Sequence, residues 1–105
     1  MNDATVTLVT CASQEEAERI ATAIVEEKLA ACVNIIPGVT SVYLWDGKLC
    51  RESERLMVIK SRRPKEEALR IRILALHSYK VPEIVTFPIA SGHEAYLRWI
   101  TEATS

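Results

Sequence analysis

The stretch VYLWDGKLC, residues 42–50, decides the fold because it places an Asp-Gly pair between two runs of apolar residues. Asp46-Gly47 in that setting is the strongest short sequence signal for a tight β-hairpin. Two large aromatic residues, Tyr43 and Trp45, fall close to the expected turn. A hairpin tip normally carries polar residues, so these aromatic side chains indicate that the tip is a packing surface or a binding surface.

The arms of this hairpin are unusually long. Residues 32–45 are mostly β-branched or aromatic, and residues 48–61 form the returning arm. Pro37 has no backbone N–H to donate to a neighbouring strand, and Gly38 has no side chain to pack, so we expect a bend, a bulge or a sheet edge at that point. An arm of about 14 residues at about 3.3 Å each spans roughly 45 Å, which is more than the strands of a small domain usually cover. Part of the hairpin should therefore extend beyond the rest of the domain.

The turn also predicts a pairing register. If Asp46-Gly47 is the turn, simple counting gives three cross-strand pairs, and a bulge would shift them. These pairs are Leu44 with Leu49, Val42 with Arg51, and Ile36 with Met57.

A strand and a helix precede the hairpin. Residues 5–11 are short and rich in β-branched residues, which predicts a strand. Ser13 and Glu16 have the spacing of a capping box, in which the Ser hydroxyl and the Glu side chain each accept a backbone N–H of the other residue. A helix should begin there, with an apolar stripe at helical spacing formed by Ala17, Ile20, Ala21, Ile24 and Leu29.

A second helix, a strand and a last helix follow the hairpin. Pro64 suits the first position of a helix whose apolar stripe is Ala68, Leu69, Ile73 and Leu76. Residues 77–83 (HSYKVPE) form the connection to a strand over 84–89, which Pro88 ends or places at an edge. Ser91 and Glu94 repeat the capping-box pattern before a helix that carries Tyr96, Leu97 and Ile100 on one face.

This order of elements predicts an α+β fold: the ferredoxin-like split βαβ arrangement (βαββαβ) with an added C-terminal helix, in one domain over 1–105. The sheet would be antiparallel with helices on one face. Several strands carry apolar residues on both sides, so the other face needs a cover. A second copy of the chain is the economical cover, because burying apolar area stabilises by about 25 cal/mol per Å².

Composition narrows the partners and the compartment. The 13 basic and 14 acidic residues nearly balance, which disfavours nucleic acid and anionic membranes as partners. No apolar run approaches the ~18 residues of a membrane span, and residues 1–5 lack the features of a signal peptide. Three cysteines without C-x-x-C spacing are typical of buried thiols in a reducing compartment, so we expect a cytoplasmic protein.

Enzyme signatures are missing from the sequence. It contains no Walker loop, no G-x-G-x-x-G, no nucleophile elbow and no H-E-x-x-H. We therefore expect a protein that is not an enzyme, with a small hydrolase or a protein-interaction scaffold as an alternative.

Four separated segments closely resemble the CutA family of divalent-cation tolerance proteins. The segments are EEKLAACVNIIPGVTSVYLWDGKL, Lys60-Ser61, HSYKVPEI and YLRWI, and the likeness runs from about residue 5 to residue 100. The resemblance implies a cytoplasmic homotrimer with a ferredoxin-like fold, whose long hairpins pair with strands of neighbouring subunits. It also implies a role in the response to divalent metal ions, and an architecture like that of the trimeric PII signalling proteins, which bind small effectors between subunits.

The resemblance further implies copper binding. In some members the proposed site uses a Cys early in the chain and a pair of His residues at the positions of Leu76 and His77. Here only His77 is present, and Val9 stands at the early Cys position with Cys11 two residues further on. His77 is thus the expected metal ligand, for Cu²⁺ or another divalent cation, with no other cofactor expected.

His77 is also the strongest individual candidate from the residues themselves, because it begins a connection where functional side chains concentrate. A neutral imidazole ligates metals, and Glu83 could supply a carboxylate or fix the ring's tautomer. The alternative is that His77 near a helix C-terminus only complements the helix dipole. A metal site built by one chain has little support, because donors at ligand spacing are lacking, but a trimer could combine donors from several chains.

The remaining candidates would line a cleft between subunits. Lys60 interrupts an apolar strand and, with Arg62, could hold a small anionic effector; alternatively it forms an ion pair with Glu83 or Glu52. Trp45 and Tyr79 are the aromatic residues expected in the cleft. The predicted binding set is therefore Trp45, Lys60, Tyr79 and Glu83, with His77 for a metal.

Overall fold

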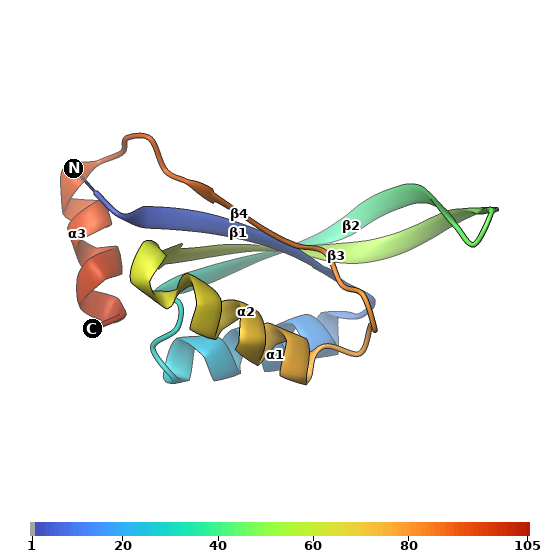
Figure 1. Ribbon diagram of the computed structural model, residues 1–105, viewed down its shortest axis with the longest axis horizontal. Helices are drawn as coiled ribbons and strands as arrows, with labels where there is room; N and C mark the ends of the chain where they lie inside the picture. The colour runs from blue at the N-terminus through green and yellow to red at the C-terminus, as the bar shows by residue number, and fades with distance from the viewer. Residues whose placement is uncertain (1) are drawn as a thin grey trace.

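The computed structural model describes residues 2–105. Its eight secondary-structure elements form one four-stranded antiparallel sheet and the helices that pack against it (Figure 1). They are β1 (Ala4–Cys11), α1 (Gln14–Glu26), β2 (Cys32–Trp45), β3 (Lys48–Arg62), a 3₁₀ turn η1 (Arg63–Lys65), α2 (Glu66–Leu76), β4 (Ile84–Pro88) and α3 (Glu94–Ala103). The strand order is β2-β3-β1-β4. The predicted mixed α+β class, antiparallel sheet and long hairpin are confirmed.

α1 and α2 lie side by side on one face of the sheet, while α3 packs at the end where the two termini lie (Figure 1). The main core sits between this face and the two helices. It contains Val9, Met57 and Ile59 from the strands and Ile20, Ile24, Leu69 and Ile73 from the helices, all essentially without exposure. A smaller cluster of Ala4, Ala31 and Ile100 attaches α3. No helix in residues 2–105 is long and apolar enough to cross a membrane.

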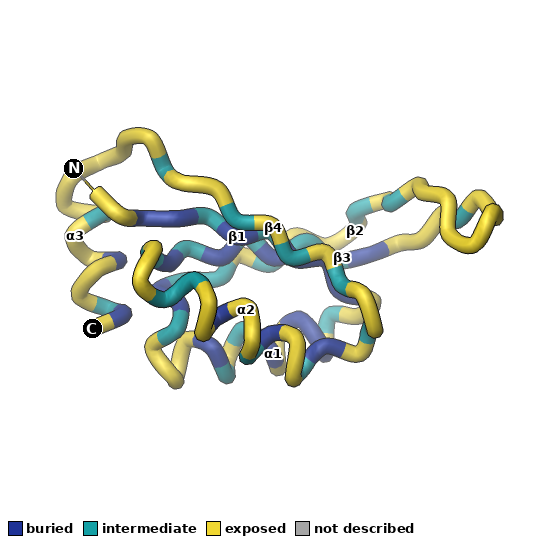
Figure 2. The backbone as a smooth tube through the Cα atoms, viewed as in Figure 1, coloured by how far each residue is buried: buried dark blue, intermediate teal, exposed yellow. Residues whose placement is uncertain are grey.

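The β2–β3 hairpin extends beyond the helices and makes the molecule 44 Å long against 25 and 22 Å in the other directions (Figure 1). Asp46 (φ 52°) and Gly47 (φ 76°) form the turn, as predicted. Figure 2 shows that the projecting part is largely exposed. Trp45 and Leu44 are 54% and 71% exposed there, so the protomer itself does not cover the apolar tip.

The register confirms two of the three predicted pairs. Leu44 pairs with Leu49 and Val42 with Arg51, but Ile36 pairs with Leu56 and not with Met57. The shift comes from an irregularity between Ile36 and Val39, where Gly38 adopts φ 73°. Simple counting failed there because the Pro-Gly pair inserts an extra residue into one arm.

The expected helix starts are correct in part. Ser13 accepts the Glu16 backbone N–H at 3.1 Å, as predicted, but the Glu16 side chain turns to Ser78 instead of returning to Ser13. The capping box predicted at Ser91 is wrong, since α3 is capped by His93 without a side-chain hydrogen bond. The helix predicted to begin at Pro64 begins instead at Glu66, and Pro64 lies within the η1 turn that precedes it.

The sheet face opposite α1 and α2 is apolar and lacks a cover. Side chains alternate along a strand, so the residues between the buried ones of β1 face away from the helices. Leu8 pairs there with Val58 and Val85, and Val6 pairs with Phe87. Val85 and Phe87 are nearly half exposed. Within the described residues this face remains open, as the two-sided apolar pattern predicted.

Candidate functional site

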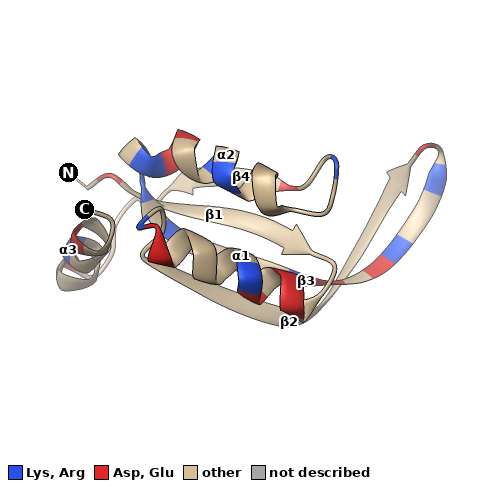
Figure 3. Cartoon of the chain, turned by 90° about the horizontal axis from the view of Figure 1, so that it is seen from below, with Lys and Arg blue, Asp and Glu red and all other residues tan. Residues whose placement is uncertain are grey.

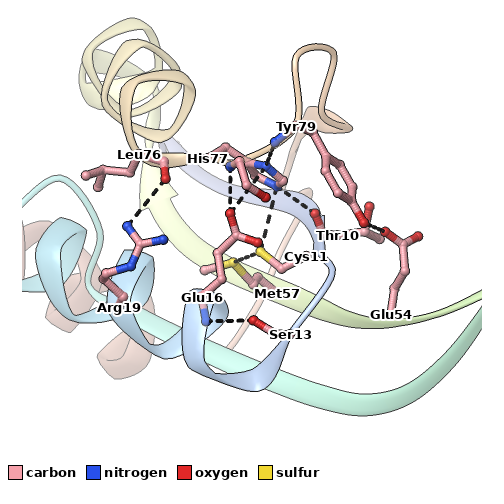
Figure 4. Close-up of polar contacts among 11 residues, drawn as sticks. Thr10, Cys11, Ser13, Glu16, Arg19, Glu54, Met57, Leu76, His77 and Tyr79 are labelled. Carbon is pink, nitrogen blue, oxygen red and sulfur yellow. Dashed lines mark hydrogen bonds and ion pairs between the residues drawn. The ribbon is translucent and has the colours of Figure 1, made fainter.

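His77 anchors the connection between α2 and β4 into the protein interior. It caps the C-terminus of α2, and its side chain has no exposed surface. Nε2 lies 2.8 Å from the Thr10 carbonyl oxygen, and Nδ1 accepts the Tyr79 backbone N–H at 3.0 Å (Figure 4). A carbonyl only accepts and an amide only donates, so His77 is the neutral tautomer with its hydrogen on Nε2. Both ring nitrogens are therefore engaged.

Glu16 holds the same connection from the side of α1. Its Oε2 accepts the Ser78 backbone N–H at 2.6 Å and lies 3.8 Å from His77 Nδ1. Burial alone would raise the pKa of the Glu16 carboxyl, but the hydrogen bonds from Ser78 and the charge of Arg19 outweigh burial, so the pKa lies below its usual value. An ionised carboxylate thus fixes the start of the loop.

Cys11 lies beneath His77, at the end of β1. Its Sγ is 3.4 Å from Met57 Sδ and 3.8 Å from His77 Nε2, and the residue is fully buried. Burial, reinforced by the charges of Glu16 and Glu54, raises the pKa of the Cys11 thiol to about 12. At neutral pH Cys11 is therefore an unreactive thiol.

These donors do not suit a metal ion within one protomer. Residues 2–105 contain no group of three or more His, Cys, Asp and Glu side chains placed to hold one. His77 has no free lone pair, and metal ligands among cysteines must be thiolates, which Cys11 is not. Metal ligation by His77 stays a prediction that would require the ring to release Thr10 or the Tyr79 amide.

A groove of about 400 Å³ lies where the hairpin leaves the body of the protein. Tyr79 forms one wall and donates its hydroxyl hydrogen to Glu54 Oε2 at 2.7 Å (Figure 4). Tyr43 and Glu83 also line the groove, and the remaining lining residues are Thr10, Ser41, Val42 and Val81. His77 lies directly behind Tyr79, with the two ring centroids 4.8 Å apart. The buried anchor of the loop thereby sets the position of the groove wall.

The groove is acidic. Among the described residues that line it, Glu54 and Glu83 are charged and no Lys or Arg is present. Burial and the hydrogen bond to Glu54 raise the pKa of Tyr79, and desolvation with the charges of Cys50, Glu52 and Glu54 raises that of Tyr43. The two carboxylates give the groove a negative potential, which attracts cations. Elsewhere basic and acidic side chains are interspersed over the helices and hairpin (Figure 3).

The structure brings together only some of the predicted site residues. Tyr79 and Glu83 share the groove, and His77 supports it from behind. Trp45 instead lies beside the turn at the hairpin tip. Lys60 hydrogen-bonds Asn34, and it forms no ion pair with Glu83 or Glu52 within residues 2–105. In β3 it is six residues beyond Glu54, so it does not line the groove with Tyr79.

Arg62, the second expected cation, is also used elsewhere. Its guanidinium donates to Thr104 Oγ1 at 2.7 Å and to the Thr104 carbonyl at 3.1 Å, which fastens the end of α3 to β3. Neither basic side chain of the proposed anion site is therefore near the groove.

Sequence reasoning missed Glu54 as a site residue. Glu54 is only 6% exposed although it lies among charged residues in RESER, residues 51–55. The alternation of side chains along the strand was a weak signal that Glu54 is buried, because it places Glu54 on the same sheet face as the apolar residues Leu56 and Val58. Its partner Tyr79 is 25 residues away in sequence, so no local pattern joins the two.

A second, larger hollow of about 1090 Å³ lies between α3, the N-terminal residues and the connection after β4. Arg63 and Arg98 line it together with Asp3 and Glu94. Arg98 contacts Glu94 at 3.3 Å, and the charges balance. The hollow therefore has no evident preference for a ligand.

Comparison with known proteins identifies the family. Residues 5–103 match the family model described as CutA1 divalent ion tolerance protein. The chain is 50% identical over 99 residues to the divalent-cation tolerance protein CutA of Thermus thermophilus, covering 94% of this chain and 96% of that protein. A solved structure of the Cut A1 protein from that organism superimposes with a TM-score of 0.94 at 48% identity, covering 97% of this chain and 99% of the other.

A structure from Archaeoglobus fulgidus, described as a periplasmic divalent cation tolerance protein CutA, also has a TM-score of 0.94, at 41% identity over 97% of this chain and 99% of that one. Sequence and fold agree over nearly the whole length. The chain therefore belongs to the CutA1 divalent ion tolerance family.

Proposed function

We propose that the protein is a homotrimeric binding protein of the response to divalent cations, and that each protomer presents a cation site in the groove of Tyr43, Glu54, Tyr79 and Glu83. It acts by binding and not by catalysis. The observation that carries this proposal is the charge of the groove, which holds two carboxylates and no basic side chain among the described residues.

The trimer is supported by two exposed apolar surfaces on the protomer. One is the open sheet face around Val85 and Phe87, and the other is the hairpin tip with Leu44 and Trp45. Exposed apolar areas of this kind mark association surfaces. A ferredoxin-like trimer, as the family resemblance implies, would cover both and place the grooves near subunit boundaries.

A PII-like sensor of an anionic effector is less well supported. That alternative used Lys60 and Arg62, which are bound to Asn34 and Thr104 at a distance along β3 from the groove. An anion in the groove would face Glu54 and Glu83 without a compensating charge. The cationic ligand is therefore preferred.

The link to copper depends on His77 in this proposal, while the groove itself offers oxygen donors, which suit hard cations such as Mg²⁺ or Mn²⁺ better than copper. The cytoplasmic location also stays a prediction, since the Archaeoglobus fulgidus relative is described as periplasmic.

Calorimetric titration tests the proposed function. Mn²⁺, Cu²⁺ and Zn²⁺ are added to the purified protein, to Glu83→Gln, and to the matched control Glu26→Gln on α1. We expect binding by the wild type and by Glu26→Gln that weakens in Glu83→Gln. Sedimentation should give a mass three times 11.8 kDa. A folded protein that binds no cation of any kind would contradict the proposal.

A further inference from the structure

We draw no further inference here: the strongest candidate, the hollow of about 1090 Å³ between α3, the N-terminal residues and the connection after β4, offers an anion the N-terminus of α3 and the exposed Arg63 and Arg98, but among the described residues no buried, unpartnered polar side chain lines it as a second sign of a ligand.

Discussion

The Tyr79 hydroxyl donates to Glu54 Oε2 at 2.7 Å, and this one bond joins the connection before β4 to the base of the hairpin. The two residues are 25 positions apart, and Glu54 is nearly fully buried. The bond fixes the Tyr79 ring as one wall of the groove, and it gives one of the two Glu54 carboxylate oxygens a hydrogen-bond donor. It also positions Tyr79 over His77, whose ring is held by Thr10 from below.

Tyr79→Phe should lower the free energy of unfolding by about 1.5–3 kcal/mol, the usual contribution of a hydrogen bond to a charged group. The phenyl ring still fills the space, so the loss reports the hydroxyl. Urea unfolding measures it. In a double-mutant cycle with Glu54→Gln, the two effects should not add, since both remove the same charged bond. Additive effects would show that the bond is absent in solution.

Glu16→Gln should destabilise the protein at pH 7 by about 1–1.5 kcal/mol, because a neutral amide accepts the Ser78 N–H more weakly than a carboxylate does. The pKa of Glu16 is lower in the folded than in the unfolded protein, so its contribution is fully present above the unfolded value of 4.5 and is lost as pH falls through the folded pKa. The difference between wild type and variant should therefore shrink in acid. Urea midpoints at pH 7, 5 and 3.5 measure this, with Glu26→Gln as control; a difference that stays constant with pH would contradict the assignment.

Features that depend on residues close together in the sequence were predictable, and contacts between residues far apart in the sequence were not. The hairpin turn, the bulge and the helical stripes are encoded by neighbouring residues, and Asp46-Gly47, Pro37-Gly38 and Ile20 with Ile24 were all placed correctly. The capping box at Ser13 shows the limit. Local spacing predicted that Glu16 returns to Ser13, but the Ser78 amide from a distant loop competes for the same carboxylate.

The site was predictable only in outline for the same reason. Tyr79 and Glu83 belong to one short connection, so their proximity follows from the sequence. Glu54 joins them only through the sheet and the loop anchor. Lys60 was placed with them because it interrupts an apolar strand, yet position along β3 puts it beside Asn34. The residue type of Lys60 suggested a role in binding, but its position along β3 determines which side chains it contacts.

Alkaline pH should destabilise the protein through Cys11. The pKa of this thiol is about 12 in the folded protein against 9.0 for an ordinary thiol, so below pH 9 both states keep the proton. Between pH 9 and about pH 12 the unfolded chain releases a proton that the folded protein retains, and stability falls by up to about 1.4 kcal/mol per pH unit. Tyr79, whose pKa is also raised, adds to this loss above its ordinary value of 10.0.

Urea midpoints at pH 7.5, 9 and 10 measure this slope. Cys11→Ala should be less stable throughout, because it leaves a small cavity, but its midpoint should decline less steeply with pH than that of the wild type. Cys32→Ala, which removes a half-buried thiol elsewhere in the protein, is the matched control and should keep the wild-type slope. Equal slopes in all three proteins would refute the role of Cys11.

Trp45→Ala should weaken self-association, because the protomer leaves this side chain 54% exposed and only another chain could bury it. Burial of a Trp at an association surface commonly contributes 2 kcal/mol or more, so we expect the proposed trimer to dissociate at protein concentrations roughly 30-fold higher or more. Sedimentation velocity over a dilution series measures this. Leu74→Ala on α2 is the matched control, since Leu74 is similarly exposed, at 48%, but lies on the side of the sheet that the helices already cover. Its association should equal that of the wild type. A wild-type protein that sediments as a folded species of 11.8 kDa at micromolar concentration would show that the tip and the open sheet face stay in solvent, and the groove would then be complete within one chain.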